Sequence, residues 1–258
     1  MKPSAPLSHV DALAWQHLTF ISDLHLQASQ HATFELWLKS LQTLQTDALF
    51  ILGDLFEVWV GDDILDAPEG YFERLCCEAL LQLSHRLPVY WMVGNRDFLW
   101  GDKAARRSGM QTLCDPCVLE TMEGRWLLSH ADALCVADTA YQAFRQQVRS
   151  DGWQAKFLSH RLEERLQMAR DLRTQSEALK QSQTHWVDVD NSAALSLLQT
   201  HQATLLIHGH THQPAIHALS DTQKRWVLSD WDAQANPPRA QWLVWQRGLG
   251  LSRQNLVA

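Results

Sequence analysis

The chain has 258 residues, of which 46% are hydrophobic, and it carries a formal net charge of −7. This length and apolar content fit one large domain, or one domain with an insertion, that buries a substantial core. The negative charge argues against broad nucleic-acid binding through a basic surface. The apolar runs are too short to span a bilayer, and we expect no signal peptide.

The first half of the chain alternates short apolar runs with segments of helical spacing. Residues 1–14 are mixed in composition and contain two prolines, and we expect a loose extension there. The patterns that follow predict strands over 15–21, 48–52, 89–93, 117–122 and 125–129, and helices over 31–45, 70–86 and 101–108. Such alternation is typical of an α/β layered fold with mostly parallel strands, which binds ligands beyond the carboxyl ends of its strands.

Residues 138–186 interrupt this alternation, because they are polar and helical in propensity and contain no strand-like segment. They hold eight basic and six acidic side chains, so their net charge is +2 on a chain that is otherwise −9. We interpret them as a helical insertion or lid, and the alternative is a solvated amphipathic helix pair. Apolar side chains are also present: Tyr141, Phe144, Trp153, Phe157 and Leu158.

The last part of the chain returns to the α/β pattern. A helix is predicted over 188–201, with Asp190 or Asn191 able to cap it, and a strand over 204–207. Three closing antiparallel strands are predicted over 214–219, 226–229 and 241–245.

Metal-ligating side chains follow the ends of the predicted strands. The candidate ligands are Asp23, His25, Asp54, Asn95, His130, His208 and His210. An Asp or His alone after a strand is usually a turn former or a satisfied core residue, but here the same placement recurs five times. We expect His212 to be a supporting or surface histidine.

The mixed nitrogen and oxygen donors suit Mn²⁺, Fe²⁺ or Zn²⁺ better than Ca²⁺. Seven donors are too many for one tetrahedral ion. Two ions about 3.5–4 Å apart that share a carboxylate fit better, and such pairs hydrolyse phosphate esters.

The chain has five scattered cysteines, an odd number that suggests a reducing compartment. Cys114 and Cys117 have CxxC spacing, but the sequence contains no second CxxC pair. We interpret both as ordinary thiols, with a zinc or redox role as the alternative.

Asp23-x-His25, Gly53-Asp54, Gly94-Asn95-Arg96-Asp97, His130 and Gly209-His210 resemble, in order and spacing, the motifs of the calcineurin-like metallophosphoesterases. The likeness extends over roughly residues 18–230. Within this superfamily the sequence is most similar to the UDP-2,3-diacylglucosamine pyrophosphatases of the lipid A pathway, which it resembles in the segments 21–25, 51–57, 94–99, 141–144 and 208–212.

This resemblance implies an αββα sandwich of two mixed sheets over residues 15–258, with a helical cap insertion at about 138–186. It also implies two Mn²⁺ ions with Asp54 bridging them. One ion would be held by Asp23, His25 and His210, and the other by Asn95, His130 and His208.

The reaction implied is hydrolysis of UDP-2,3-diacylglucosamine to UMP and 2,3-diacylglucosamine 1-phosphate, by attack of a metal-bridging hydroxide on the α phosphorus. The catalytic residues implied are Asp54, Asn95, Arg96 and His130. The substrate-binding residues implied are Asn95, Arg96, Asp138, Ser176, Lys180 and His208. A lipid substrate and the missing membrane span predict a cytoplasmic monomer that is peripheral on the inner membrane.

Arg96 also indicates which kind of bond is cleaved. Many relatives in the superfamily carry His at this position, directly after the Asn that corresponds to Asn95. Arginine cannot act as an acid but pairs well with phosphate oxygens. A phosphate leaving group, with a second pKa of roughly 6, needs no proton donor. Arg96 and the cap therefore disfavour a nucleotide phosphodiesterase or a protein phosphatase, and the filled ligand positions disfavour a non-catalytic scaffold.

Overall fold

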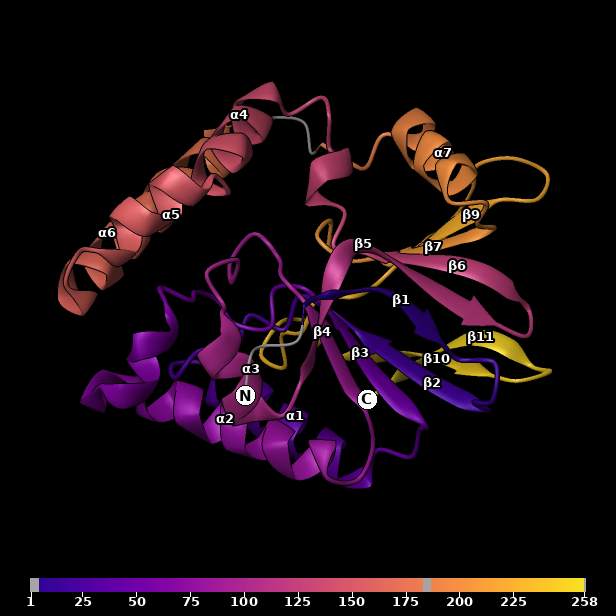
Figure 1. Cartoon of the computed structure of the whole chain (residues 1–258), viewed down its shortest axis with the longest axis horizontal. Coiled ribbons are helices and arrows are strands. Elements are labelled where there is room, and N and C mark those ends of the chain that lie inside the picture. Colours follow the sequence, from indigo (N-terminus) through magenta and orange to yellow (C-terminus); the bar gives the residue numbers. More distant parts are fainter. Residues whose placement is uncertain (1–4, 183–186, 258) are drawn as a thin grey trace.

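The computed structural model describes residues 5–182 and 187–257, without the side chains of 175–182, and shows two layers of β-structure between helices (Figure 1). The strands are β1 (Leu7–Asp11), β2 (His17–Ile21), β3 (Ala48–Leu52), β4 (Val89–Met92), β5 (Gln111–Thr121), β6 (Gly124–Ser129), β7 (Leu205–His208), β8 (Ile216–Ala218), β9 (Lys224–Val227), β10 (Gln241–Gln246) and β11 (Gly250–Asn255). The helices are α1 (His31–Thr43), α2 (Tyr71–Ser84), α3 (Asp102–Ser108), α4 (Thr139–Val148), α5 (Asp151–Leu158), α6 (Leu162–Ser182) and α7 (Asn191–Thr200), with 3₁₀ turns η1 (Asp62–Asp66), η2 (Pro68–Gly70) and η3 (Asp132–Leu134).

The strand order is β11-β10-β2-β3-β4-β5-β6-β7-β9-β8, and β1 pairs with β5 off this path. The long strand β5 connects the two layers. Its start pairs in parallel with β4 at Gln111 and Thr112, and its end pairs antiparallel with β6 from Cys117 to Thr121. The α/β fold with mixed strand directions that the sequence predicted is confirmed.

Burial along β3 shows how the layers pack. All five residues of this strand are buried, as expected for a strand covered on both faces. Leu49 and Ile51 join the core beneath α1 and α2, whereas Phe50 and Leu52 join the core between the sheets. A third core lies under α7, where Leu198 packs with Leu206 of β7.

Two expectations for the ends of the chain need correction, and one strand was missed. Residues 7–11 are not a loose extension, because β1 pairs in parallel with β5 and buries Val10 between the sheets. The segment predicted over 226–229 is β9, which runs parallel to β7 and antiparallel only to β8. Strand β11 was not predicted, and it pairs with β10 at the edge of the sheet.

The predicted insertion contains α4, α5 and α6, which we call the cap, and they lie along one side of the molecule (Figure 1). Ion pairs and hydrogen bonds join the cap to the 3₁₀ turns η1 and η3. The Asp132 carboxylate accepts hydrogen bonds from Arg145 Nε at 2.8 Å and from the Tyr141 hydroxyl at 2.7 Å, and Arg165 pairs with Asp63. Part of the cap's apolar surface is core, because Phe157 is buried there.

No helix in the described part of the chain is both long and apolar enough to cross a membrane.

Candidate metal centre

The register of the parallel strands brings the predicted motifs to one edge. Ile21 pairs with Ile51, and Leu52 pairs with Met92, so the loops after β2, β3 and β4 begin side by side. In the second sheet Ser129 pairs with His208, which aligns the ends of β6 and β7. The five clusters therefore meet, as expected for carboxyl ends of parallel strands.

The backbone turns sharply at this edge. Five of the Asp and His residues here have left-handed φ angles: Asp23 (53°), His25 (49°), Asp54 (51°), His210 (70°) and His212 (54°). Such conformations are uncommon outside glycine and concentrate at functional sites, where the surrounding structure maintains them. Here they turn side chains from different strands towards one point.

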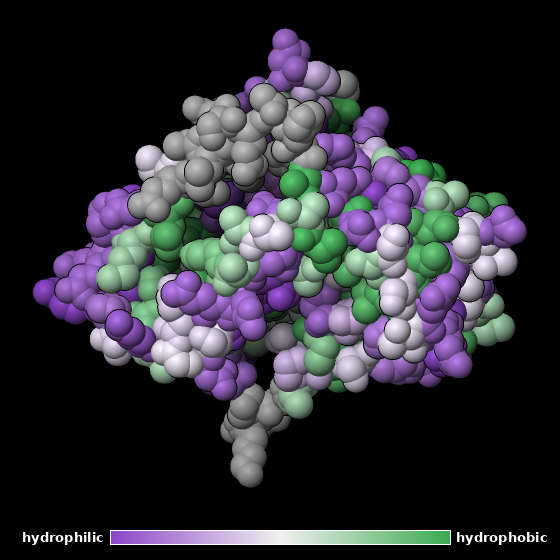
Figure 2. Space-filling model, turned by 90° about the horizontal axis from the view of Figure 1, so that it is seen from above, coloured by the Kyte–Doolittle hydropathy of each residue, from purple (hydrophilic) through white to green (hydrophobic). Residues whose placement is uncertain are grey.

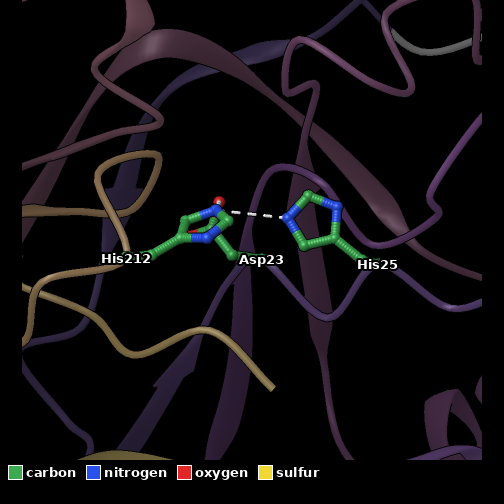
Figure 3. A group of neighbouring side chains, drawn as sticks. All are labelled: Asp23, His25 and His212. Carbon is green, nitrogen blue, oxygen red and sulfur yellow. Dashed lines mark hydrogen bonds and ion pairs between the residues drawn. The ribbon is translucent and has the colours of Figure 1, made fainter. Parts of the chain in front are cut away.

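One group of donors consists of Asp23, His25 and His212, whose ligand atoms lie within 4.8 Å of one another. The Nε2 atoms of His25 and His212 face each other at 3.2 Å (Figure 3). His212 Nε2 lies 3.3 Å from Asp23 Oδ1. The Asp23 carboxylate is fully buried and accepts hydrogen bonds from the backbone N–H of His210 at 2.9 Å and from the Ser22 hydroxyl at 2.5 Å.

The second group is formed by Asp23, Asp54 and His130, with Asn95 and His210 beside it. His130 Nε2 lies 2.9 Å from Asn95 Oδ1 and 3.7 Å from Asp54 Oδ1, and His210 Nδ1 lies 2.8 Å from the same Asn95 oxygen.

The tautomer of His130 is fixed by its surroundings. A carbonyl can only accept, so in the neutral ring the 3.0 Å contact with Leu52 O places the proton on Nδ1 and directs the Nε2 lone pair into the site. This is the usual arrangement of a metal-ligating histidine.

Asp54 lies between the two groups. Its Oδ2 is 3.9 Å from His25 Nε2 of the first group, and its Oδ1 faces His130 of the second. The backbone N–H of Arg96 donates to Oδ1 at 2.8 Å and holds the carboxylate in place. Asp54 therefore directs one oxygen towards each group, and its bridging role stays a prediction.

The structure does not bring His208 into either donor group, and its predicted roles as metal ligand and substrate contact stay predictions. His208 shares the α7 side of β7 with Leu206, and it is fully buried there. Its Nδ1 lies 2.9 Å from Gly209 O, and its Nε2 accepts from Arg225 Nη1 at 3.2 Å, so both ring nitrogens are occupied. His212, expected to be supporting, joins the first group instead, and His210 lies with the second.

Asp97 connects two of the converging loops. Its buried carboxylate accepts from the N–H groups of Gly94 at 2.7 Å, Leu55 at 2.8 Å and Phe56 at 3.4 Å. Burial and the nearby Asp54 charge raise the pKa of Asp97 to about 7. The contact fixes the loop that carries Asn95 against the loop that carries Asp54.

The site is electrostatically coupled. Burial would raise the pKa of Asp23, but the His212, His130 and His25 imidazoles hold it well below its usual range. Burial would lower the pKa of His130, yet the Asp54, Asp23 and Asp132 carboxylates raise it to about 9. Burial and His130 lower the pKa of His210 to about 3. Close carboxylates and imidazoles of this kind suit a cation that takes deprotonated ligands.

The donor set therefore fits divalent metal. It combines carboxylate oxygens, imidazole nitrogens and one amide oxygen, which are ligands of Mn²⁺, Fe²⁺ or Zn²⁺. The Nε2 atoms of His25 and His212 face each other, and His130 and His210 both face Asn95 Oδ1. An ion bound at each place would be a partner for these atoms. The described residues could hold two ions, one in each group. Asp23 belongs to both groups, and the Asp54 carboxylate lies between His25 of the first and His130 of the second.

The predicted substrate contacts lie in different places. Arg96 lines a groove of about 210 Å³ together with His25, His212, Glu57 and Arg173. Asp138 is the N-cap of α4, where its carboxylate accepts from Tyr141 N at 3.0 Å. Ser176 and Lys180 lie in α6 but outside the residues whose side chains are described. Glu57 and Arg173 were not predicted as site residues.

This chain is similar to known proteins in sequence. The family model of calcineurin-like phosphoesterases matches residues 17–214. A UDP-2,3-diacylglucosamine hydrolase of Bordetella pertussis is 43% identical over 247 residues, covering 93% of this chain and 95% of that protein. A protein of the same name from Chromobacterium violaceum is 46% identical over 216 residues, covering 82% and 89%. The chain belongs to the calcineurin-like phosphoesterase family.

Proposed function

We propose that this protein hydrolyses the pyrophosphate bond of UDP-2,3-diacylglucosamine, giving UMP and 2,3-diacylglucosamine 1-phosphate, with two Mn²⁺ ions as cofactors. The observation that carries the proposal is the position of Asp54 between two donor groups, with Arg96 beside it in one groove. The names of the relatives supply the substrate.

Each residue then has a chemical role. Bound metal ions of this kind lower the pKa of a water and offset charge on phosphate oxygens. Asp23, His25 and His212 would hold one ion, and Asn95, His130 and His210 the other, with Asp54 shared. Asn95 and Arg96 lie where they can orient the diphosphate, and the Arg96 guanidinium stabilises the departing phosphate without transferring a proton.

The cap suits the lipid part of this substrate. Apolar side chains are exposed along it at Phe144, Leu158, Met168 and Leu172. Seen from above, the molecule has hydrophobic residues beside a hollow on this face (Figure 2). We propose that the protein acts as a monomer and associates peripherally with the inner membrane that holds its substrate. Asp138, Ser176 and Lys180 remain proposed substrate contacts, and His208 remains a proposed metal ligand and substrate contact.

The decisive test is hydrolysis of UDP-2,3-diacylglucosamine by metal-stripped protein, with and without added Mn²⁺, in ¹⁸O-labelled water. We expect turnover only with metal and the label in UMP, because water attacks the phosphorus next to uridine. Label in the sugar phosphate would contradict the position of attack. Metal-dependent cleavage of a generic phosphodiester with no turnover of the lipid would overturn the proposed substrate.

Replacing Arg96 by His tests the pyrophosphate specificity. We expect kcat/KM for the lipid to fall about 10- to 100-fold, which is what one charge-assisted contact is worth. Hydrolysis of bis(p-nitrophenyl) phosphate should persist, because the metal ligands are unchanged. Arg106→His, on the exposed side of α3, is the matched control, and unchanged lipid turnover in Arg96→His would refute the role.

A further inference from the structure

We propose that Glu57 is a positioning residue that sets the orientation of a metal-ligating histidine and of two phosphate-facing arginines through one carboxylate. Glu57 follows β3 in the loop that also carries Asp54, and it is 8% exposed. Its oxygens face different partners, and each partner lines the groove beside the metal centre.

One carboxylate oxygen faces the metal centre. Glu57 Oε2 lies 3.0 Å from His25 Nδ1. The two atoms are not aligned for a hydrogen bond, but the negative charge beside Nδ1 favours the tautomer that carries its proton there. The Nε2 lone pair of His25 then points towards Asp23 and His212. A carboxylate behind a ligating imidazole also makes the imidazole a stronger donor.

The other oxygen faces two cations. Glu57 Oε1 forms ion pairs with Arg96 Nη1 at 3.4 Å and with Arg173 of α6. Arg96 comes from the loop after β4, whereas Arg173 belongs to the cap, so one oxygen fixes two guanidiniums from different parts of the chain. Both are thereby held at the groove where a diphosphate would lie.

The backbone makes Glu57 a fixed support for these contacts. Its N–H donates to Leu26 O at 3.2 Å, and Leu26 forms a parallel bridge with Phe56. The segment that carries Glu57 is therefore joined directly to the segment that carries His25. A side chain on such a base can hold its partners with little freedom of its own.

The test is Glu57→Gln, which keeps the size of the side chain and removes its charge. Mn²⁺ binding is followed by the electron paramagnetic resonance signal of the free aqueous ion. We expect the dissociation constant of one Mn²⁺ to rise about 10- to 100-fold, the usual cost of losing such a support. At saturating Mn²⁺, kcat should recover while KM for the lipid stays raised about tenfold, because the arginines have lost a charged partner.

Two further variants complete the test. Glu164→Gln removes an exposed carboxylate that pairs with His160, and it should bind Mn²⁺ as the wild type does. If Glu57→Gln does not fold, Glu57→Asp takes its place in the test. It keeps the charge but shortens the side chain by one methylene, and it should also weaken Mn²⁺ binding.

A wild-type Mn²⁺ titration in a folded Glu57 variant would overturn the inference, and an unchanged KM would overturn its arginine half. Only the kcat and KM measurements rest on the proposed function. If the wild-type protein does not hydrolyse the lipid, the proposed function fails while the Mn²⁺ titration still decides the role of Glu57.

Discussion

Asp54→Asn is expected to lower turnover at saturating Mn²⁺ by at least about 1000-fold, because the shared carboxylate contributes several kcal/mol to stabilising charge at such a site. The amide keeps the shape of the side chain and removes its negative charge. Asp54 lies 3.9 Å from His25 Nε2 and 3.7 Å from His130 Nε2, so its loss affects both groups. Steady-state hydrolysis and the metal content of dialysed protein are the two measurements.

The control is Asp66→Asn, which removes a carboxylate of the same kind from an exposed ion pair with Lys103. We expect this variant to bind two Mn²⁺ ions and to turn over normally. Two bound ions and turnover within tenfold of wild type in Asp54→Asn would mean that Asp54 is not shared between the ions.

Asp97→Ala has the largest effect on stability that we expect. The buried carboxylate accepts from three backbone N–H groups, and each buried donor left without a partner costs about 1–3 kcal/mol. A loss of about 3 kcal/mol should lower the melting temperature by roughly 6–12 °C in a protein of this size. Thermal unfolding of metal-free protein measures it.

Asp97→Asn provides the comparison, because its amide oxygen can still accept while its NH₂ group cannot. We expect its melting temperature to lie between those of the wild type and Asp97→Ala. Activity should fall in both variants even with excess Mn²⁺, since the Asn95 and Asp54 loops are no longer fixed to each other. An Asp97→Ala protein that melts like the wild type would disprove this role.

Local sequence pattern determined most of the elements and the edge at which the site lies. The run over 48–52 was predicted with the bounds that β3 has, and the apolar runs before Asp23, Asp54, Asn95 and His130 all form strands. A buried parallel strand needs a continuous apolar run, and a functional loop must follow its carboxyl end. Both are properties of adjacent residues, so they are visible in the sequence alone.

Only the tertiary structure decided which members of the histidine triple face the metal centre. Alternation along a strand assigns faces while the chain stays extended, and on that basis His208 and His210 were chosen. The chain leaves the strand after His208 and takes left-handed turns at His210 and His212. Those turns direct His210 and His212 into the site, while His208 stays on the α7 side against Arg225.

Long-range partners explain the other differences. Strand β1 exists because β5, more than a hundred residues later, offers it an edge, and β9 is parallel because β7 lies beside it. Glu57 ends one of the resembling segments, but the sequence assigned it no role, since its contacts with His25, Arg96 and Arg173 come from three other segments. Periodicity records which face of an element is buried, but the packing of distant elements decides what that face meets.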